Sequence, residues 1–193
     1  MDDISAEKEL LRKKFLGIRN GLSDRDKLNA AICQKLIKLP QLARVRTICV
    51  FFSLEGEVDI RPFISTLFRL GKIVLALKVK NKRELEIRKL TSLSELVIGV
   101  YRVQEPADTC EVVPKKSVDL FLVPGICFDR HGYRIGWGKG YYDRLLADVA
   151  TDKIGVAYRA QVVADVPHTS YDVRMSAVVT EKKVIRPKKG EQT

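Results

Sequence analysis

Apolar side chains along this chain follow two kinds of spacing, helical repeats and short continuous runs. One helical repeat passes through Leu10, Leu11, Phe15 and Ile18, and a second passes through Leu28, Ile32, Leu36 and Ile37. The first predicts a helix from Asp3 or Ser5 to about Arg19 with one buried face. The second predicts a helix that opens at Ser23 with Asp26, a pair typical of a capping box.

Short apolar runs rich in β-forming residues predict strands at residues 47–53, 72–77, 118–123, 153–157 and 177–180. Residues 85–90 are the expected hairpin partner of the second strand. Between the strands we predict a helix that Asp59 caps and Gly71 ends, and a later helix over residues 141–149. This alternation predicts an α/β fold with three layers, αβα, in which helices cover both faces of a mostly parallel, Rossmann-like central sheet. We expect one domain over residues 1–187 and a basic C-terminal tail over residues 188–193.

Composition narrows the class of protein. The chain has 193 residues, 46% of them hydrophobic, which allows a substantial core, and no apolar stretch approaches the ~20 residues of a membrane span. Its four cysteines, Cys33, Cys49, Cys110 and Cys127, are widely separated, so we expect them to be reduced and buried. We expect a soluble, cytoplasmic protein that has no membrane partner and acts as a monomer.

The formal net charge of +11 raises the question of a polyanionic partner. Lysines and arginines are spread along the chain, and no recognised nucleic-acid-binding module accompanies them. Many are expected on solvated helix and hairpin faces. We expect no nucleic-acid partner, although a basic nucleic-acid-binding protein stays open as an alternative.

A glycine-rich segment, R-I-G-W-G-K-G-Y-Y-D at residues 134–143, carries the most chemical information. Glycines at alternate positions allow positive φ and let backbone N–H groups turn toward an anion. Lys139 and Arg134 add positive charge, and Asp143 could hold a metal. The segment is not a Walker loop, because Gly140 rather than Ser or Thr follows the lysine, and it does not match the dinucleotide motif G-x-G-x-x-G.

The context of the glycines favours a binding site over a plain turn, which is the alternative explanation. The segment lies between a predicted core strand and the start of a predicted helix, where free N–H groups and the helix dipole attract an anion. Glu57, Asp129 and the pair Tyr158-Arg159 also follow predicted strands, and ligands of such sheets bind beyond the carboxyl ends of the strands. The predicted ligand is a nucleotide phosphate.

The same residues resemble the signature of a known family. The stretch Pro124-Gly125-Ile126-Cys127-Phe128-Asp129, with Gly132, Arg134, Gly136 and residues 138–143, resembles that of the 5-formyltetrahydrofolate cyclo-ligases, also called 5,10-methenyltetrahydrofolate synthetases. The similarity extends to Lys8-Glu9-Leu10-Leu11-Arg12, to residues 52–59 and to residues 166–172, and so covers nearly the whole chain.

The resemblance implies a fold similar to that of sugar-phosphate isomerases and coenzyme A transferases. It also implies ATP-dependent cyclisation of 5-formyltetrahydrofolate to 5,10-methenyltetrahydrofolate with release of ADP and phosphate. In this reaction the formyl oxygen is phosphorylated and nitrogen 10 then attacks the formyl carbon. ATP and Mg²⁺ are the implied co-substrate and metal, and the surplus positive charge suits a polyglutamylated folate.

The family pattern also implies roles for individual residues of this sequence. It assigns ATP to Lys8, Arg12, Arg134, Gly136, Trp137, Gly138, Lys139, Gly140, Tyr141 and Tyr142. It assigns the folate to Phe52 and Glu57, with Trp137, Gly138, Lys139, Gly140 and Tyr141 shared. Catalysis is implied for Lys139, which would meet the transferring phosphoryl group, and for Arg134 and Tyr142. Asp143 and Asp172 would hold magnesium, because hard oxygen ligands suit that ion.

Two positions depart from the family pattern. Ser176 stands near a position where relatives often have an acidic residue, which leaves Asp172 as a less secure metal ligand. Trp137 stands where a small or basic residue is common, so the indole either stacks on a ligand or covers the site. Another enzyme of similar fold and an inactive folate-binding relative remain alternatives, because fold alone does not decide function.

Overall fold

The computed structural model describes residues 3–187, and the predicted basic tail at 188–193 lies outside these residues. The helices are α1 (Asp3–Asn20), α2 (Arg25–Ile37), α3 (Pro40–Arg44), α4 (Arg61–Arg69) and α5 (Tyr141–Leu146), with short 3-10 turns at Leu93–Glu95, Val100–Arg102, Lys115–Ser117 and Arg159–Gln161. The strands are β1 (Thr47–Val50), β2 (Ile73–Val79), β3 (Leu85–Leu90), β4 (Leu96–Ile98), β5 (Gln104–Pro106), β6 (Leu120–Pro124), β7 (Cys127–Asp129), β8 (Arg134–Ile135), β9 (Asp152–Val156), β10 (Val162–Val163), β11 (Ala177–Val179) and β12 (Val184–Ile185).

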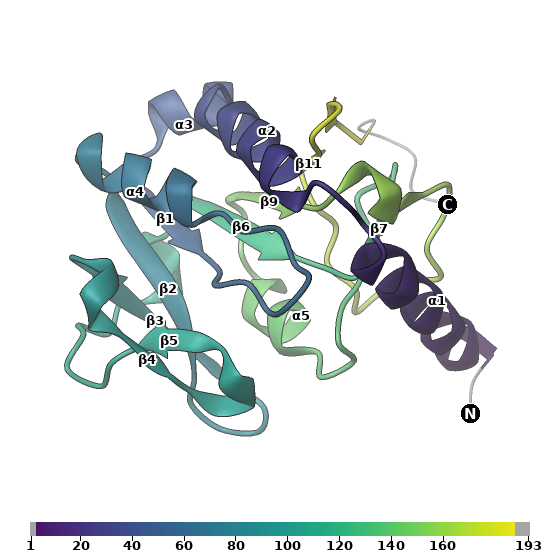
Figure 1. Cartoon of the computed structure of the whole chain (residues 1–193). Helices are drawn as coiled ribbons and strands as arrows, with labels where there is room; N and C mark the ends of the chain where they lie inside the picture. The colour runs from purple at the N-terminus through teal and green to yellow at the C-terminus, as the bar shows by residue number, and fades with distance from the viewer. Residues whose placement is uncertain (1–2, 188–193) are drawn as a thin grey trace.

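The central sheet has seven strands in the order β12-β11-β9-β6-β1-β2-β3. The inner pairs are parallel, with Cys49 of β1 in register with Leu75 on one side and Phe121 on the other. The two edge pairs, β2 with β3 and β11 with β12, are antiparallel. The predicted mostly parallel sheet and the hairpin at residues 85–90 are therefore confirmed (Figure 1).

Helices cover both faces of this sheet, as predicted. On one face α2, α3 and α4 pack against side chains that include Ile48, Val74, Leu120 and Ile154. On the other face Leu146 of α5 packs with Cys49, Leu75, Phe121 and Phe128. Successive residues of a strand point to opposite faces, which is why Ile48 and Cys49 belong to different clusters. The three-layer αβα architecture is confirmed.

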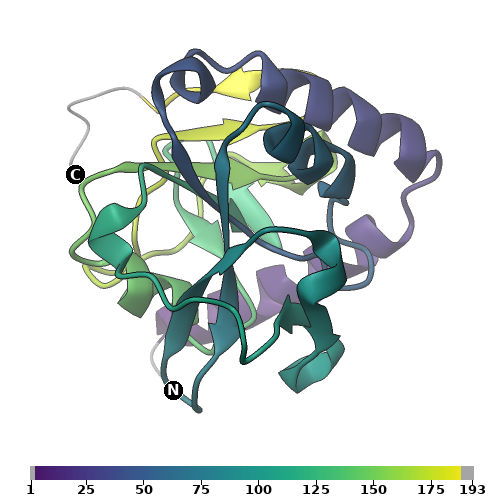
Figure 2. The same ribbon diagram turned by 90° about the vertical axis from the view of Figure 1, so that its left-hand side faces the viewer.

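Helix α1 is set apart from the other helices and lies beside the small sheet β10-β7-β8 (Figures 1 and 2). Its Phe15 packs against Ile126, Cys127 and Ile135 of that region. The predicted buried face is correct for Phe15, which is buried, and for Leu11, which packs beside it, but wrong for Leu10 (71% exposed) and Ile18 (37% exposed). A helix that packs on a two- or three-residue strand has only a narrow stripe covered.

Several element ends differ from the prediction. Helix α2 begins at Arg25 after Asp24 in the left-handed conformation (φ 53°), without a side-chain cap from Ser23. The N-cap of α4 is Ile60 instead of the predicted Asp59, although Asp59 Oδ1 accepts a hydrogen bond from Arg61 N. Gly71 (φ 67°) follows the end of that helix, as predicted. Strand β1 stops at Val50 instead of residue 53, and α5 stops at Leu146 instead of residue 149.

The small sheets β10-β7-β8 and β4-β5 were not predicted. Their strands have two or three residues each, too few for a period in the sequence to show. The predicted reduced, buried cysteines are confirmed, and burial raises the pKa of the Cys127 thiol to about 12. Within residues 3–187 no helix combines the length and the apolar character needed to cross a membrane.

Candidate active site

A cavity of about 960 Å³ lies at the carboxyl ends of the central strands. Strands β1 and β6 are neighbours, but the chain proceeds from β1 to β2 on one side and from β6 to β9 on the other. Such a reversal of strand order opens a crevice between adjacent loops. Phe51 and Phe52, which follow β1, line the cavity together with Pro124 and Gly125 at the end of β6.

All the residues to which the family pattern assigns a role line this one cavity. They are Lys8, Arg12, Phe52, Glu57, Arg134, Gly136, Trp137, Gly138, Lys139, Gly140, Tyr141, Tyr142, Asp143 and Asp172. They come from α1, the loop after β1, the glycine segment with α5, and the loop before β11. The structure thus brings together the residues that the family pattern assigns to the site, while the role of each one stays a prediction.

The glycine segment begins in β8 and runs into α5, so it lies between the core strand β6 and a helix as predicted, with the short strand β7 between β6 and the segment. Gly138 (φ 83°) and Gly140 (φ 65°) have positive φ, which favours glycine, whereas Gly136 is not among the residues with positive φ. A Cβ at Gly138 would lie 3.4 Å from Nη2 of Arg12. The positive φ of Gly138 and Gly140 therefore explains why the loop needs glycine for its turn, and the Arg12 side chain lies in ordinary contact distance of Gly138.

Positive charges from two segments meet at the glycine end of the cavity. Lys8 Nζ donates to Asp172 Oδ2 (2.6 Å), and Arg12 Nε donates to the Gly136 carbonyl (2.9 Å). Arg134 is 6% exposed, and its Nη2 lies 3.0 Å from Asp143 Oδ1. The Lys139 side chain is exposed and forms no ion pair within residues 3–187. Lys139 is therefore available to an incoming anion.

The two predicted metal ligands make their contacts through one oxygen each. Asp143 Oδ1 accepts from Arg134 and from Val173 N (3.1 Å), and Asp172 Oδ2 accepts from Lys8 and from Thr169 N (2.8 Å). Burial raises the pKa of Asp172, but these hydrogen bonds outweigh it and leave the pKa below its ordinary value. Both groups are hard oxygen ligands at one cavity, although no group of three or more metal-ligating side chains occurs among the described residues. An ion here would need phosphate or water oxygens as well.

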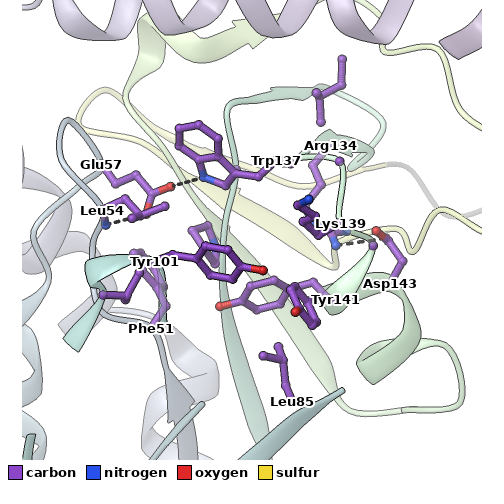
Figure 3. A pocket seen from close by; sticks show the side chains of 18 of the residues that line it. Phe51, Leu54, Glu57, Leu85, Tyr101, Arg134, Trp137, Lys139, Tyr141 and Asp143 are labelled. Atoms are coloured by element: carbon purple, nitrogen blue, oxygen red, sulfur yellow. Dashed lines mark hydrogen bonds and ion pairs between the residues drawn. The ribbon is translucent and has the colours of Figure 1, made fainter. Parts of the chain in front are cut away.

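At the opposite end of the cavity Glu57, which is 9% exposed, lies near Phe51, Phe52 and Leu54, and Gln104 and Glu105 also line the cavity. Its Oε1 accepts from Trp137 Nε1 (3.2 Å) and its Oε2 from Leu54 N (3.1 Å), as Figure 3 shows. Burial raises the pKa of Glu57 above its ordinary value, and these two donors together with Arg19 oppose the rise. A carboxylate in apolar surroundings is suited to bind a ring that carries several N–H donors.

Sequence reasoning missed one side of the cavity. Tyr101 lies opposite the glycine segment with Leu85 and Phe51 nearby (Figure 3), and Val103 lines the same side. Tyr101 has φ 64°, uncommon for a residue other than glycine, in the turn between β4 and β5. The apolar run Leu96–Ile98 with its following tyrosine was the available signal, but nothing in it indicates its partner.

Three candidates named for their position after strands lie outside the cavity lining. Asp129 is 1% exposed and accepts hydrogen bonds from the backbone N–H groups of His131, Tyr133 and Val166. Tyr158 is buried behind Glu57, and Arg159 Nη1 donates to the Val162 carbonyl. Asp129 therefore organises the turn after β7, where its carboxylate satisfies three backbone donors.

Comparison with known proteins identifies the family of this chain. The model of the 5-formyltetrahydrofolate cyclo-ligase family matches residues 4–181. The 5-formyltetrahydrofolate cyclo-ligase of Escherichia coli K12 is 33% identical over 156 residues, which are 78% of this chain and 86% of the relative.

Two solved structures share the fold. The 5,10-methenyltetrahydrofolate synthetase of Aquifex aeolicus superposes with a TM-score of 0.85 at 35% identity, over 96% of this chain and 95% of the other. The synthetase of Mycoplasma pneumoniae gives a TM-score of 0.74 at 27% identity, over 94% of this chain and 99% of the other. With the family match over residues 4–181, they show that this chain belongs to the 5-formyltetrahydrofolate cyclo-ligase family.

Proposed function

We propose that this chain catalyses the ATP-dependent cyclisation of 5-formyltetrahydrofolate to 5,10-methenyltetrahydrofolate, with release of ADP and phosphate. The observation that supports it most is the cavity itself, where residues matching the family signature converge from separate segments. Its volume of about 960 Å³ is near the upper end of small-molecule sites, about 300–1,000 Å³, and suits two substrates.

The proposed chemistry makes a poor leaving group into a good one. The formyl oxygen attacks the γ-phosphorus of ATP, the bond from that phosphorus to ADP breaks, and a phosphorylated formyl group forms. Nitrogen 10 then attacks the formyl carbon, the carbon–oxygen bond breaks, and phosphate leaves together with the proton of nitrogen 10. Positioning and charge neutralisation supply most of the catalysis in phosphoryl transfer.

The distribution of charge in the cavity supports an orientation for the two substrates. The cations Lys8, Arg12, Arg134 and Lys139 are grouped around the glycine segment, which suits the phosphates of ATP. Glu57 lies toward the apolar side with Phe52 and Trp137, which suits the pteridine ring. The formyl group would then lie between them, within reach of Lys139.

Tyr142 and the two aspartates complete the proposal. Burial raises the pKa of Tyr142 well above its ordinary value, so the hydroxyl stays protonated and acts as a neutral donor near Arg134. Asp143 and Asp172 would hold Mg²⁺, directly or through water. When bound, the ion neutralises charge on the phosphates of ATP.

The direct test incubates the purified protein with 5-formyltetrahydrofolate and magnesium, with and without ATP, and follows the ultraviolet absorbance of the methenyl product. We expect product only with ATP, in equal amount to the ADP released. Absence of ATP-dependent product would refute the proposal. Folate binding without turnover would then identify an inactive relative, and salt-sensitive binding to nucleic acid would favour the nucleic-acid alternative.

A substitution in α1 tests the predicted phosphate contact of Lys8. We expect Lys8→Met to raise KM for ATP by about tenfold, since a charge-assisted contact of ~1.5–3 kcal/mol is lost. KM for 5-formyltetrahydrofolate should change less than twofold. Lys13→Met is the matched control, because Lys13 is exposed on the same helix and does not line the cavity. Equal KM values for ATP in Lys8→Met and Lys13→Met would contradict the predicted contact between Lys8 and the phosphates.

A further inference from the structure

Arg19, in the last turn of α1, lies behind the cavity instead of lining it. Only 1% of its surface is exposed, and burial lowers the pKa of its guanidinium, whereas Glu57 raises it. Taking a charge out of water is costly unless another charge and hydrogen bonds compensate for the lost hydration. The partners of Arg19 therefore indicate why a charge is placed there.

The contacts of Arg19 lead to the residues proposed to bind the folate. Its Nη1 lies 3.5 Å from Glu57 Oε1, the same oxygen that accepts from Trp137 Nε1. Its Cζ lies 5.5 Å from the centroid of the Trp137 ring, and its Nη2 donates to the Glu55 carbonyl (3.1 Å). Within residues 3–187, Nε and Nη1 have no hydrogen-bond acceptor. Arg19 is thus held mainly by its charge and by packing behind Glu57 and Trp137.

Glu57 needs such a cation if it binds a donor-rich ring. Burial favours the neutral form of its carboxyl, and a neutral carboxyl accepts hydrogen bonds less well. The groups that face this carboxyl are the Trp137 indole, the Leu54 N–H and the hydroxyl of Tyr142, whereas the Tyr158 hydroxyl donates to the main-chain carbonyl of Glu57 (3.5 Å). Arg19 supplies the positive charge among these neighbours.

We propose that Arg19 is a positioning residue that keeps Glu57 ionised and oriented, so that Glu57 selects a substrate ring with adjacent N–H and amino donors. Arg19 itself does not touch the substrate and acts through Glu57. This inference rests on the proposed function, because it concerns the folate end of the same cavity. The alternative is a purely structural role, in which Arg19 only ties α1 to the loop after β1 through the Glu55 carbonyl.

The test measures the affinity for 5-formyltetrahydrofolate by isothermal titration calorimetry with ADP in place of ATP. We expect Arg19→Met to raise Kd by about tenfold or more, and Arg19→Lys to restore part of the affinity. Arg25→Met is the matched control. Arg25 donates to the Arg19 and Asn20 carbonyls at the end of the same helix, but it does not line the cavity. Its Kd should stay within about twofold of wild type.

A double-mutant cycle separates positioning from a structural role. If Arg19 acts through Glu57, Arg19→Met in a Glu57→Gln background should cause no further loss of affinity. The double variant also removes both buried charges, so it keeps the test valid if Arg19→Met alone does not fold. Equal losses from Arg19→Met in both backgrounds would overturn the inference.

The pH dependence gives a second readout that a structural role would not change. Without the cation, Glu57 should take up a proton at a higher pH than in wild type, so the affinity of Arg19→Met should begin to fall at a higher pH as the pH is lowered. Parallel pH profiles, or an unchanged Kd in Arg19→Met, would refute the role of Arg19. If wild type itself binds no 5-formyltetrahydrofolate, the proposed function fails instead.

Discussion

Replacing Lys139 with alanine is expected to lower kcat by about 10³-fold or more. This is the range seen when an enzyme loses a side chain that stabilises the charge of a transferring phosphoryl group. Lys139 is exposed in the cavity and forms no ion pair within residues 3–187, so its charge is free to meet the phosphoryl group. The fold should stay intact, because the Lys139 side chain is exposed. Steady-state kinetics and thermal unfolding measure the two effects.

The control for this experiment is Lys38→Ala. Lys38 is an exposed lysine that follows α2 and does not line the cavity, so its loss changes the net charge equally without touching the site. Its kcat should stay within about twofold of wild type. Near-normal turnover in Lys139→Ala would refute the proposed contact with the phosphoryl group.

Replacing Glu57 with glutamine is expected to raise KM for 5-formyltetrahydrofolate by about 10²-fold, because truncating the charge of a buried pair costs about 2–5 kcal/mol. KM for ATP should change little, since the cations at the glycine end are unaffected. Glu55→Gln is the matched control, as Glu55 is exposed in the same loop and does not line the cavity. A folate KM close to wild type would exclude Glu57 from the folate site.

The raised pKa of Glu57 also predicts different pH profiles for wild type and Glu57→Gln. Burial raises that pKa, so protonation of the carboxylate begins at a higher pH than for an ordinary glutamate. In wild type, kcat/KM for the folate should fall as the pH is lowered through this value. In Glu57→Gln this limb of the profile should be absent. A wild-type limb that persists in the variant would belong to another group.

Local patterns were enough to predict most of the fold. Short apolar runs predicted the strands of the central sheet, and Gly71 marked the end of α4 correctly. The errors fall where packing partners decide the outcome. The helical spacing of Leu10 and Leu11 would be the same whether α1 packed on the central sheet or on a short strand. Leu10 is exposed because α1 packs on a short strand.

The same division applies to the site. The glycine segment and the family resemblance predicted residues that the structure finds around one cavity, from Lys8 to Asp172. Tyr101 and Arg19 escaped prediction, although both lie close to that cavity or behind it. Neither residue belongs to a local sequence motif, so only the residues around it in the structure show that it lies at the site.

The amino-acid sequence by itself determined the family, the alternation of strands and helices, and which residue types carry the chemistry. These properties depend on patterns between near neighbours, such as the glycines that allow positive φ at Gly138 and Gly140. The tertiary structure decided that Lys8 meets Asp172 across 164 positions and that Arg19 lies behind Glu57. It also decided which apolar faces are covered. Those contacts depend on how the helices and loops pack on the sheet. The spacing of apolar residues along the chain does not specify that packing.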